Sequence, residues 1–146
     1  MSDVLEIENL RRLYAKATDL IALGGHERVE GARAIYHQIF TPDVDIKTSP
    51  GPDALTANSP DQWVDVVADA LEQYQSTQHM IGSQLVQLNG DQAHMESYLS
   101  AWHQRGDGSV MVFLGTYVDS VRKDRSGWQI HAMDLQRTMV YELPAQ

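Results

Sequence analysis

Six histidines are the side chains of this sequence best suited to transfer protons, because an unperturbed imidazole titrates near about pH 6.5. One of them, His103, lies at the end of residues 92–105, where small or apolar residues occupy the odd positions. That alternation predicts a strand whose odd face points toward the core, so we expect His103 to point inward. Of the other histidines, His131 stays unassigned and three are expected in solvent: His26, His37 and His94.

A second candidate, His79, lies on the preceding predicted strand, residues 77–88, and shares its parity with a mostly apolar set: Ile81, Ser83 and Leu85. The turn Asn89-Gly90-Asp91 joins the two strands as an antiparallel pair, with His79 11 positions before Gly90 and His103 13 positions after it. We therefore expect the two imidazoles to be neighbours in one cavity. The alternative is that each is a core histidine bonded to a backbone carbonyl.

Asp19 is the carboxylate that could orient one of these rings. It lies late in an apolar helical segment, where an inward-facing acid needs a partner because an unpaired buried charge is costly. An imidazole partner would have a fixed tautomer, a raised pKa and the capacity to carry a proton near neutral pH. Tyr14 and Thr18 are four residues apart on the same helix, so the Tyr14 phenol could meet a substrate oxygen. A surface position for Asp19 and a core position for Tyr14 are the alternatives.

Sequence motifs give no sign of a cofactor. The chain has no glycine-rich phosphate loop after a strand and no GxSxG, HExxH or EF-hand pattern, and its lack of cysteine excludes thiolate zinc sites and cysteine nucleophiles. His79, His103 and Asp19 have the composition of a two-histidine, one-carboxylate iron site. The same residues can act as an acid–base set alone, and we expect neither metal nor cofactor.

The first half of the chain is predicted to be helical. Three helices are expected from apolar periodicity and caps: one capped by Ser2 or Asp3 and ending at Gly24-Gly25, one over about Arg28 to Ile39, and one that starts at Ser59-Pro60-Asp61 and runs to Tyr74. A stop signal at 40–43, a short strand at 44–46 and a proline-rich loop at 48–59 are expected between the second and third helices.

The second half changes to a period of two, and three turn signals divide it into four long strands. Helices followed by an antiparallel meander indicate an α+β fold with a bent sheet around the helices and a cavity inside. The expected apolar wall of that cavity consists of Met95, Leu99, Met111, Phe113 and Tyr117. The strand at 109–123 is apolar on both parities, so we expect a second subunit to cover its outer face.

Composition narrows the set of partners. The 146 residues include 20 acidic and 11 basic side chains, a formal charge of −9, and the only basic pairs are Arg11-Arg12 and Arg122-Lys123. Such a chain repels phosphate backbones, so nucleic acid is not an expected partner. No stretch approaches the roughly 20 apolar residues of a membrane span, and residues 1–20 lack the apolar core of a leader. We expect a cytoplasmic protein with a single domain over 1–146 and no membrane partner.

At these residues the sequence resembles scytalone dehydratases and SnoaL-like proteins of the nuclear transport factor 2-like superfamily. The resemblance rests on Thr77-Gln-His79-Met-Ile-Gly82 and Trp102-His103-Gln-Arg105, with the helix from Tyr14 to Asp19 before them and Gly115-Thr-Tyr117-Val-Asp119 and Gly127-Trp128-Gln-Ile130 after them. It implies a cone-shaped fold in which a curved, mostly antiparallel sheet wraps around three N-terminal helices and encloses a deep pocket. It also implies a homodimer or homotrimer.

The resemblance implies roles for the candidate residues. In scytalone dehydratases an aspartate on the first helix and two strand histidines serve the cofactor-free elimination of water, and these match Asp19, His79 and His103. Bile-acid dehydratases of the superfamily use a tyrosine, an aspartate five residues later and a strand histidine, which match Tyr14, Asp19 and His79. Two tyrosines of scytalone dehydratases are replaced here, at Thr18 and at roughly Thr48, so we expect a different substrate.

The resulting hypothesis is a cofactor-independent lyase or isomerase acting on a small hydrophobic, oxygenated ring compound of polyketide, aromatic or steroid-like type. His79, oriented by Asp19, would remove a proton next to a carbonyl; Tyr14 would hydrogen-bond the enolate; His103 would protonate the departing hydroxyl or help to position it. Thr18 would contact the substrate. Two alternatives stay open: a module that binds a hydrophobic ligand without transforming it, and an accessory subunit resembling the β subunit of ring-hydroxylating dioxygenases.

Overall fold

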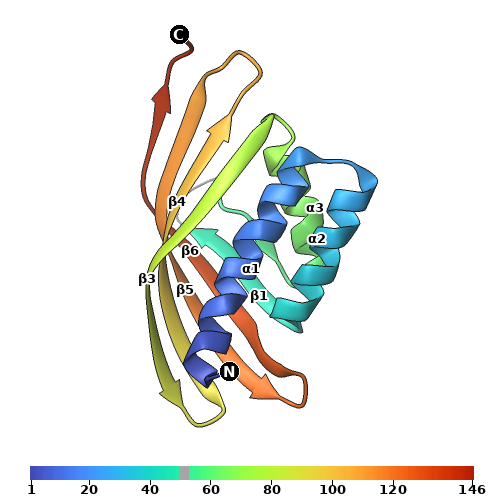
Figure 1. Ribbon diagram of the computed structural model, residues 1–146, viewed down its shortest axis with the longest axis vertical. Helices are drawn as coiled ribbons and strands as arrows, with labels where there is room; N and C mark the ends of the chain where they lie inside the picture. The colour runs from blue at the N-terminus through green and yellow to red at the C-terminus, as the bar shows by residue number, and fades with distance from the viewer. Residues whose placement is uncertain (50–52) are drawn as a thin grey trace.

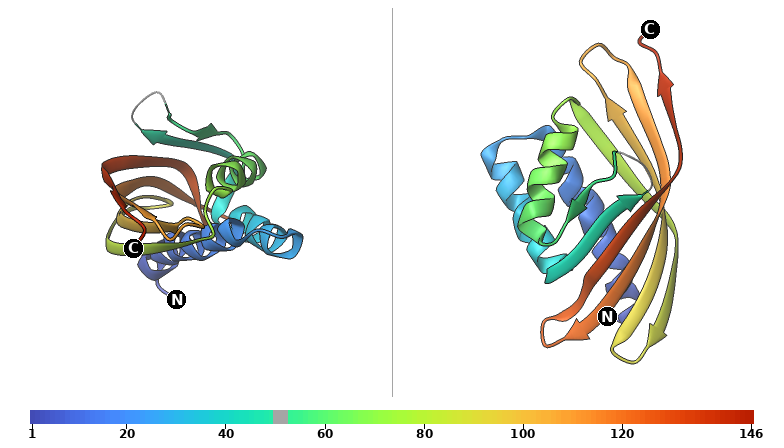
Figure 2. Two further views of the ribbon diagram at one scale, coloured as in Figure 1. Left: turned by 90° about the horizontal axis from the view of Figure 1, so that it is seen from above. Right: turned by 180° about the vertical axis from the view of Figure 1, so that it is seen from behind.

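The computed structural model describes residues 1–49 and 53–146. In chain order its elements are α1 (Asp3–Leu23), α2 (His26–Ile39), β1 (Phe40–Ser49), β2 (Thr56–Ala57), α3 (Pro60–Leu71), β3 (Ser76–Asn89), β4 (Gln92–Gln104), β5 (Val110–Asp124) and β6 (Gly127–Leu143). The strands form one mixed sheet in the order β2-β1-β6-β5-β4-β3, with β3 to β6 antiparallel and β1 parallel to β6. The sheet is strongly curved and unclosed, and the helices pack on its concave side (Figures 1 and 2). The predicted α+β cone is confirmed.

The helix ends follow the cap signals of the sequence. The Ser2 hydroxyl accepts a hydrogen bond from the backbone N–H of Leu5, and the Ser59 hydroxyl accepts one from Gln62 with proline in the first turn of α3. Gly24 is the C-cap residue that follows α1, and its φ of +74° lies in the left-handed region that favours glycine. Among the described helices, none is both long and apolar enough to cross a membrane.

Strand β1 is longer than the three-residue strand that the sequence predicts. It begins where α2 ends and spans ten residues because β6 offers it a parallel partner. Pro42 is tolerated because it lies in the irregular stretch between Phe40 and Asp45, where the register shifts. Part of the expected loop at 48–59 is therefore strand: Thr48 belongs to β1 and Thr56–Ala57 form β2, while residues 50–52 lie outside the described residues.

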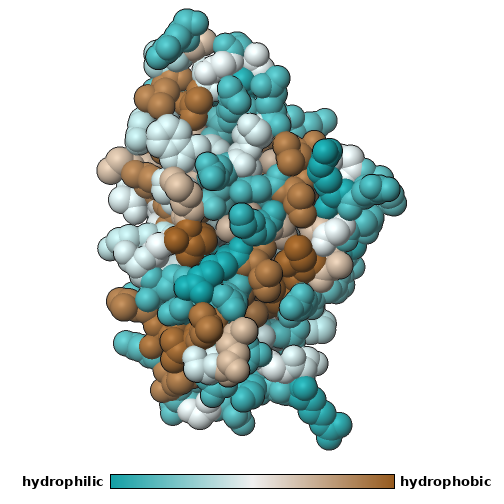
Figure 3. All heavy atoms as spheres, viewed as in Figure 1, coloured by the Kyte–Doolittle hydropathy of each residue, from teal (hydrophilic) through white to brown (hydrophobic). Residues whose placement is uncertain are grey.

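The predicted parity of β3 is correct up to Gly82 and wrong beyond it. A β-bulge between Gly82 and Leu85 gives β3 one residue more than β4, and Ser83 adopts a φ of +46°. The bulge turns Ser83 and Leu85 outward, so that Leu85 is 68% exposed, and it brings Val86 to the inner face. Figure 3 shows apolar side chains scattered among polar ones on the face that includes β3 and α1.

The predicted parity of β4 is confirmed along its whole length. The odd positions from Ala93 to His103 are buried, and the even positions are exposed or half-buried. Strand β4 lies between β3 and β5 in the sheet, and it contacts α1. The histidine at the end of its inner face is thereby placed inside the molecule.

Candidate functional site

A cavity of about 300 Å³ lies between the helices and the concave face of the sheet. Its wall is largely apolar, and the structure places four of the five expected wall residues on it: Leu99, Met111, Phe113 and Tyr117. Its polar lining includes Tyr14, Thr18, Thr48, His79 and His103. Tyr14 and Thr18 of α1, His79 of β3 and His103 of β4 therefore border one chamber. Asp19 of α1 does not line this cavity and reaches it only through its contact with His79.

Met95 is the wall residue that the structure moves elsewhere. It is wholly buried, and its sulfur accepts a contact of 3.6 Å from the Gln84 amide, but it does not line the cavity. The alternation along β4 correctly predicts that Met95 faces inward, but the prediction that it lines the cavity is wrong. The half of β4 that carries Met95 packs in the core, and the cavity begins only at Leu99.

Asp19 and His79 form a hydrogen-bonded pair. Asp19 Oδ1 lies 2.7 Å from His79 Nδ1 and also accepts from the Thr77 hydroxyl at 2.8 Å, while Oδ2 accepts from the His79 backbone N–H at 3.2 Å. A carboxylate oxygen accepts, so the hydrogen of the ring is on Nδ1, and Nε2 on the opposite side is the proton-accepting atom. The His79 side chain is only 8% exposed. The structure thus supports the inward, paired position for Asp19.

His103 lies beside this pair as a second imidazole. Its ring centroid is 5.7 Å from that of His79, and its Nδ1 lies 3.2 Å from the Met111 carbonyl oxygen, to which it must donate. Burial, and secondly the neighbouring His79, lower the pKa of His103 to about 4. At neutral pH the ring is therefore uncharged and its Nε2 can only accept a hydrogen bond. This geometry does not fit the expectation that His103 protonates a departing hydroxyl.

The lowered pKa of His103 predicts a loss of stability in mild acid. His103 takes up a proton at about pH 6.5 in the unfolded chain but only at about pH 4 in the folded protein. Between those values acid therefore lowers the free energy of unfolding, by up to about 3 kcal/mol. The stabilisation is complete above this window and is lost as the pH falls through it. We expect H103N, whose amide can still donate to Met111, to lose this part of the pH dependence in urea unfolding at pH 7, 5.5 and 4.5.

The exposed histidine of the same strand provides the control for this prediction. His94 faces outward, so H94N is expected to unfold with the wild-type pH dependence. If the free energy of unfolding changed with pH in the same way in the wild type and H103N, His103 would titrate normally in the folded protein and the prediction would be wrong.

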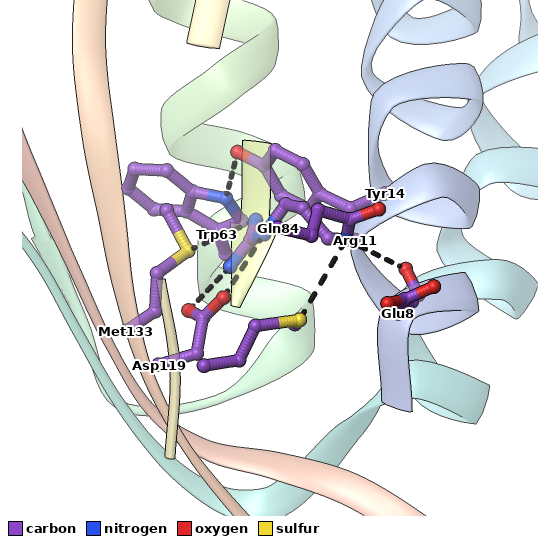
Figure 4. A network of polar contacts seen from close by, with 8 residues as sticks. Glu8, Arg11, Tyr14, Trp63, Gln84, Asp119 and Met133 are labelled. Atoms are coloured by element: carbon purple, nitrogen blue, oxygen red, sulfur yellow. Dashed lines mark hydrogen bonds and ion pairs between the residues drawn. The ribbon is translucent and has the colours of Figure 1, made fainter. Parts of the chain in front are cut away.

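Tyr14 is at once a core residue and a wall residue. Its ring stacks on Tyr36 with centroids 5.4 Å apart, and its hydroxyl oxygen accepts from the Trp63 indole N–H at 3.1 Å (Figure 4). The Thr18 and Tyr36 hydroxyls are 2.6 Å apart. Burial raises the pKa of Tyr36 and of Tyr117 well above the usual value of 10, so both remain neutral. The cavity thus borders a cluster of three phenol rings, those of Tyr14, Tyr36 and Tyr117.

A buried ion pair that sequence reasoning missed supports this cluster. Arg11 and Asp119 are both fully buried, with Nη2 to Oδ1 at 2.5 Å and Nε to Oδ2 at 3.1 Å (Figure 4). The guanidinium carbon lies 3.8 Å from the Tyr117 ring centroid and 4.5 Å from that of Tyr14. One signal was present in the sequence: Arg11 follows Ile7 by four residues and precedes Tyr14 by three, so it falls in the apolar stripe of α1.

Asp19, His79 and His103 lie close together, with a hydrogen bond between the first two and a ring contact between the histidines. Over residues 1–49 and 53–146, no three histidine, aspartate or glutamate side chains converge as the ligands of a metal ion would. Both oxygens of Asp19 accept hydrogen bonds from β3, and the Nδ1 atom of each ring is engaged. Both histidines line the cavity, and in each ring Nε2 is the nitrogen left free to accept a hydrogen bond.

A family model described as a SnoaL-like domain matches residues 1–134. No curated protein sequence matches the chain. Among solved structures, a protein of Novosphingobium aromaticivorans provisionally described as a scytalone dehydratase has a TM-score of 0.73 at 19% identity, over 96% of this chain and 87% of that one.

Two further structures share the fold. An NTF2-like protein with a cystatin-like fold from Novosphingobium aromaticivorans has a TM-score of 0.73 at 15% identity, over 93% of this chain and 82% of its own. A type 2 hexachlorocyclohexane dehydrochlorinase has a TM-score of 0.73 at 12% identity, over 99% of this chain and 93% of its own. At these identities the similarity establishes a common architecture.

Proposed function

We propose that this chain, which belongs to the SnoaL-like domain family, is a cofactor-independent lyase or isomerase acting on a small hydrophobic, oxygenated ring compound. The observation that carries the proposal is the 2.7 Å contact between Asp19 and His79 at the wall of an apolar cavity of about 300 Å³. Two proteins with this fold, one provisionally named a dehydratase and the other a dehydrochlorinase, have names that denote eliminations and so favour the same class of chemistry.

In the proposed reaction, His79 acts as the general base. Its Nε2 removes a proton from the carbon next to a substrate carbonyl, and the Asp19 carboxylate stabilises the imidazolium that forms. In a lyase the electron pair of that C–H bond forms a C=C bond, the C–O bond to the hydroxyl breaks, and the imidazolium returns its proton so that water leaves. In an isomerase the proton returns to another carbon. A positioned base of this kind contributes about 10² to 10⁴-fold to the rate.

The other polar groups of the wall would hold the substrate. The Tyr14 hydroxyl is the donor proposed for the developing enolate, and the hydrogen bond that it receives from Trp63 makes it a stronger donor. His103, being neutral, would accept a hydrogen bond from the substrate hydroxyl through Nε2 and so orient it. Thr18 and Thr48 border the same space, and in scytalone dehydratases tyrosines occupy the matching places.

Hydrogen exchange in D₂O tests the proposal without knowledge of the natural substrate. 2-Tetralone is a bicyclic ketone with acidic hydrogens next to its carbonyl. Their replacement by deuterium is measured by proton NMR as a loss of signal. We expect the protein to accelerate this exchange above the buffer rate. Quenching of the tryptophan fluorescence by 2-tetralone, with hydrogen exchange at the buffer rate, would contradict the proposal and favour a ligand-binding module.

We also propose that a second copy of the chain covers the outer face of the sheet. Exposed apolar side chains of β3, β4 and β6 lie there: Met80, Tyr98, Trp102, Met139 and Tyr141. Exposed apolar side chains gathered on one face often mark a protein–protein interface. Sedimentation equilibrium is expected to give a homodimer or homotrimer, and a monomer at all concentrations would contradict this proposal.

A further inference from the structure

Arg137 of β6 borders the cavity, together with Leu135 and Val140 of the same strand. On a regular strand Arg137 and Val140 would point to opposite faces. A bulge makes this arrangement possible, because β6 has one residue more than β5 between the pairs Leu114–Met139 and Gly115–Arg137. Gly115 permits the close approach of β6, since a Cβ atom there would lie 2.7 Å from the Gln136 carbonyl oxygen.

Arg137 lies at the solvent side of the cavity, across the sheet from His79. Arg137 is exposed, and the adjoining Leu135 pairs with Thr48, whose side chain also lines the cavity. His79 lies on β3, three strands away from β6 in the sheet, which corresponds to roughly 14 Å between the backbones at about 4.8 Å per strand. A ligand that contacts both residues would be held at two separate ends.

The charge of Arg137 has no partner among the described residues. No carboxylate in 1–49 or 53–146 lies within 4.0 Å of its guanidinium, whereas Arg11, Arg12, Arg33, Arg105 and Arg122 each form an ion pair. Asp53 is the one acidic side chain of the described residues that lines this cavity. An unpaired guanidinium beside an apolar chamber favours an anionic ligand, and its planar fork matches a carboxylate in a bidentate manner.

We propose that Arg137 binds a carboxylate of the substrate, so that the ligand of this cavity is an apolar ring compound with an acid group at its solvent-facing end. The inference rests on the proposed function for the identity of the cavity as the substrate site, and it adds the substrate class. The protein carries a net charge of −9, which repels acids in general. Arg137 supplies the local positive charge that makes the binding of an acid favourable.

Binding of two matched probes tests this proposal. 2-Naphthoate and its neutral analogue 2-naphthamide have the same ring and nearly the same shape, and both fit the chamber in size. We expect the wild type to bind 2-naphthoate about tenfold more tightly than the amide in titration calorimetry, the preference given by one charge-assisted contact. R137Q is expected to lose the preference by weakening only the acid, while R137K keeps part of it. Added salt is expected to reduce the preference.

Two further variants make each outcome decisive. D53N removes the neighbouring negative charge and is expected to bind 2-naphthoate at least as tightly as the wild type. H79Q is expected to retain the acid preference, because the preference depends on Arg137 and not on the base. Equal affinity of the wild type for acid and amide, or an equal loss of both in R137Q, would overturn the proposal. An acid preference in a protein that exchanges no 2-tetralone hydrogens would leave Arg137 as an anchor and refute only the catalytic role.

Discussion

Replacement of His79 by glutamine is expected to lower the protein-catalysed rate of hydrogen exchange of 2-tetralone by about 10² to 10⁴-fold, the usual contribution of a positioned general base. The glutamine amide can still donate to Asp19 but has no nitrogen lone pair that accepts a proton. The free energy of unfolding is expected to change by no more than about 2 kcal/mol, because the carboxylate keeps its bonds from Thr77 and the backbone. Proton NMR in D₂O measures the rate, and urea unfolding measures the stability.

The outward-facing histidine of β4 gives a matched control. H94Q makes the same chemical change at an exposed position and is expected to exchange 2-tetralone at the wild-type rate. The exchange rate of D19N is expected to lie between those of H79Q and the wild type, since D19N removes the charge that stabilises the imidazolium but leaves the base in place. Exchange by H79Q at the wild-type rate would remove His79 from the mechanism.

Replacement of Arg11 by methionine is expected to destabilise the protein by about 3 to 5 kcal/mol, because it leaves a buried carboxylate without its partner. Asp119 is fully buried, and Arg11 is the side chain that donates both of its hydrogen bonds in the described residues. The loss also removes the cation between the Tyr14 and Tyr117 rings, so we expect weaker exchange activity in the folded fraction. Urea unfolding monitored by tryptophan fluorescence gives the free-energy difference.

The next residue along the chain is the control for this change. Arg12 forms an exposed pair with Glu8 at 2.9 Å, and R12M is expected to cost less than about 1 kcal/mol. The double variant R11M/D119L is expected to regain part of the stability, because it removes the uncompensated charge along with its partner. If R11M and R12M unfold at the same urea concentration, the buried pair does not stabilise the fold.

Local signals allowed much of the fold to be predicted from the sequence. The caps at Ser2 and Ser59 and the glycine at 24 fixed the ends of helices, since capping depends on residues within one turn. The turn at Gly90 and the alternation along β4 then placed His79 and His103 on neighbouring strands. The pairing with Asp19 followed from the cost of an inward charge, a rule that needs no knowledge of the partner's position.

The features that could not be predicted depend on contacts between distant segments. The bulges at Ser83 and between Leu114 and Gly115 reverse the side-chain parity, and only the register with the neighbouring strand reveals them. They account for the outward position of Leu85 and for the inward position of Arg137. The sequence also does not show which inward residues line the cavity, because periodicity predicts the face of a strand and not the position along it. Met95 is on the predicted inner face of β4 but lies in the core.

In the proposed mechanism Asp19 holds the hydrogen of His79 on Nδ1 and leaves Nε2 as the base toward the cavity. The nitrogen-15 NMR spectrum of the His79 ring tests it most directly, recorded at about pH 9, where an ordinary imidazole is neutral. We expect a protonated Nδ1 and a bare Nε2, with the tautomer preference weakened in D19N. A spectrum in which Nε2 carries the hydrogen and Nδ1 is bare would contradict it, because that ring could not take a proton from a substrate in the cavity.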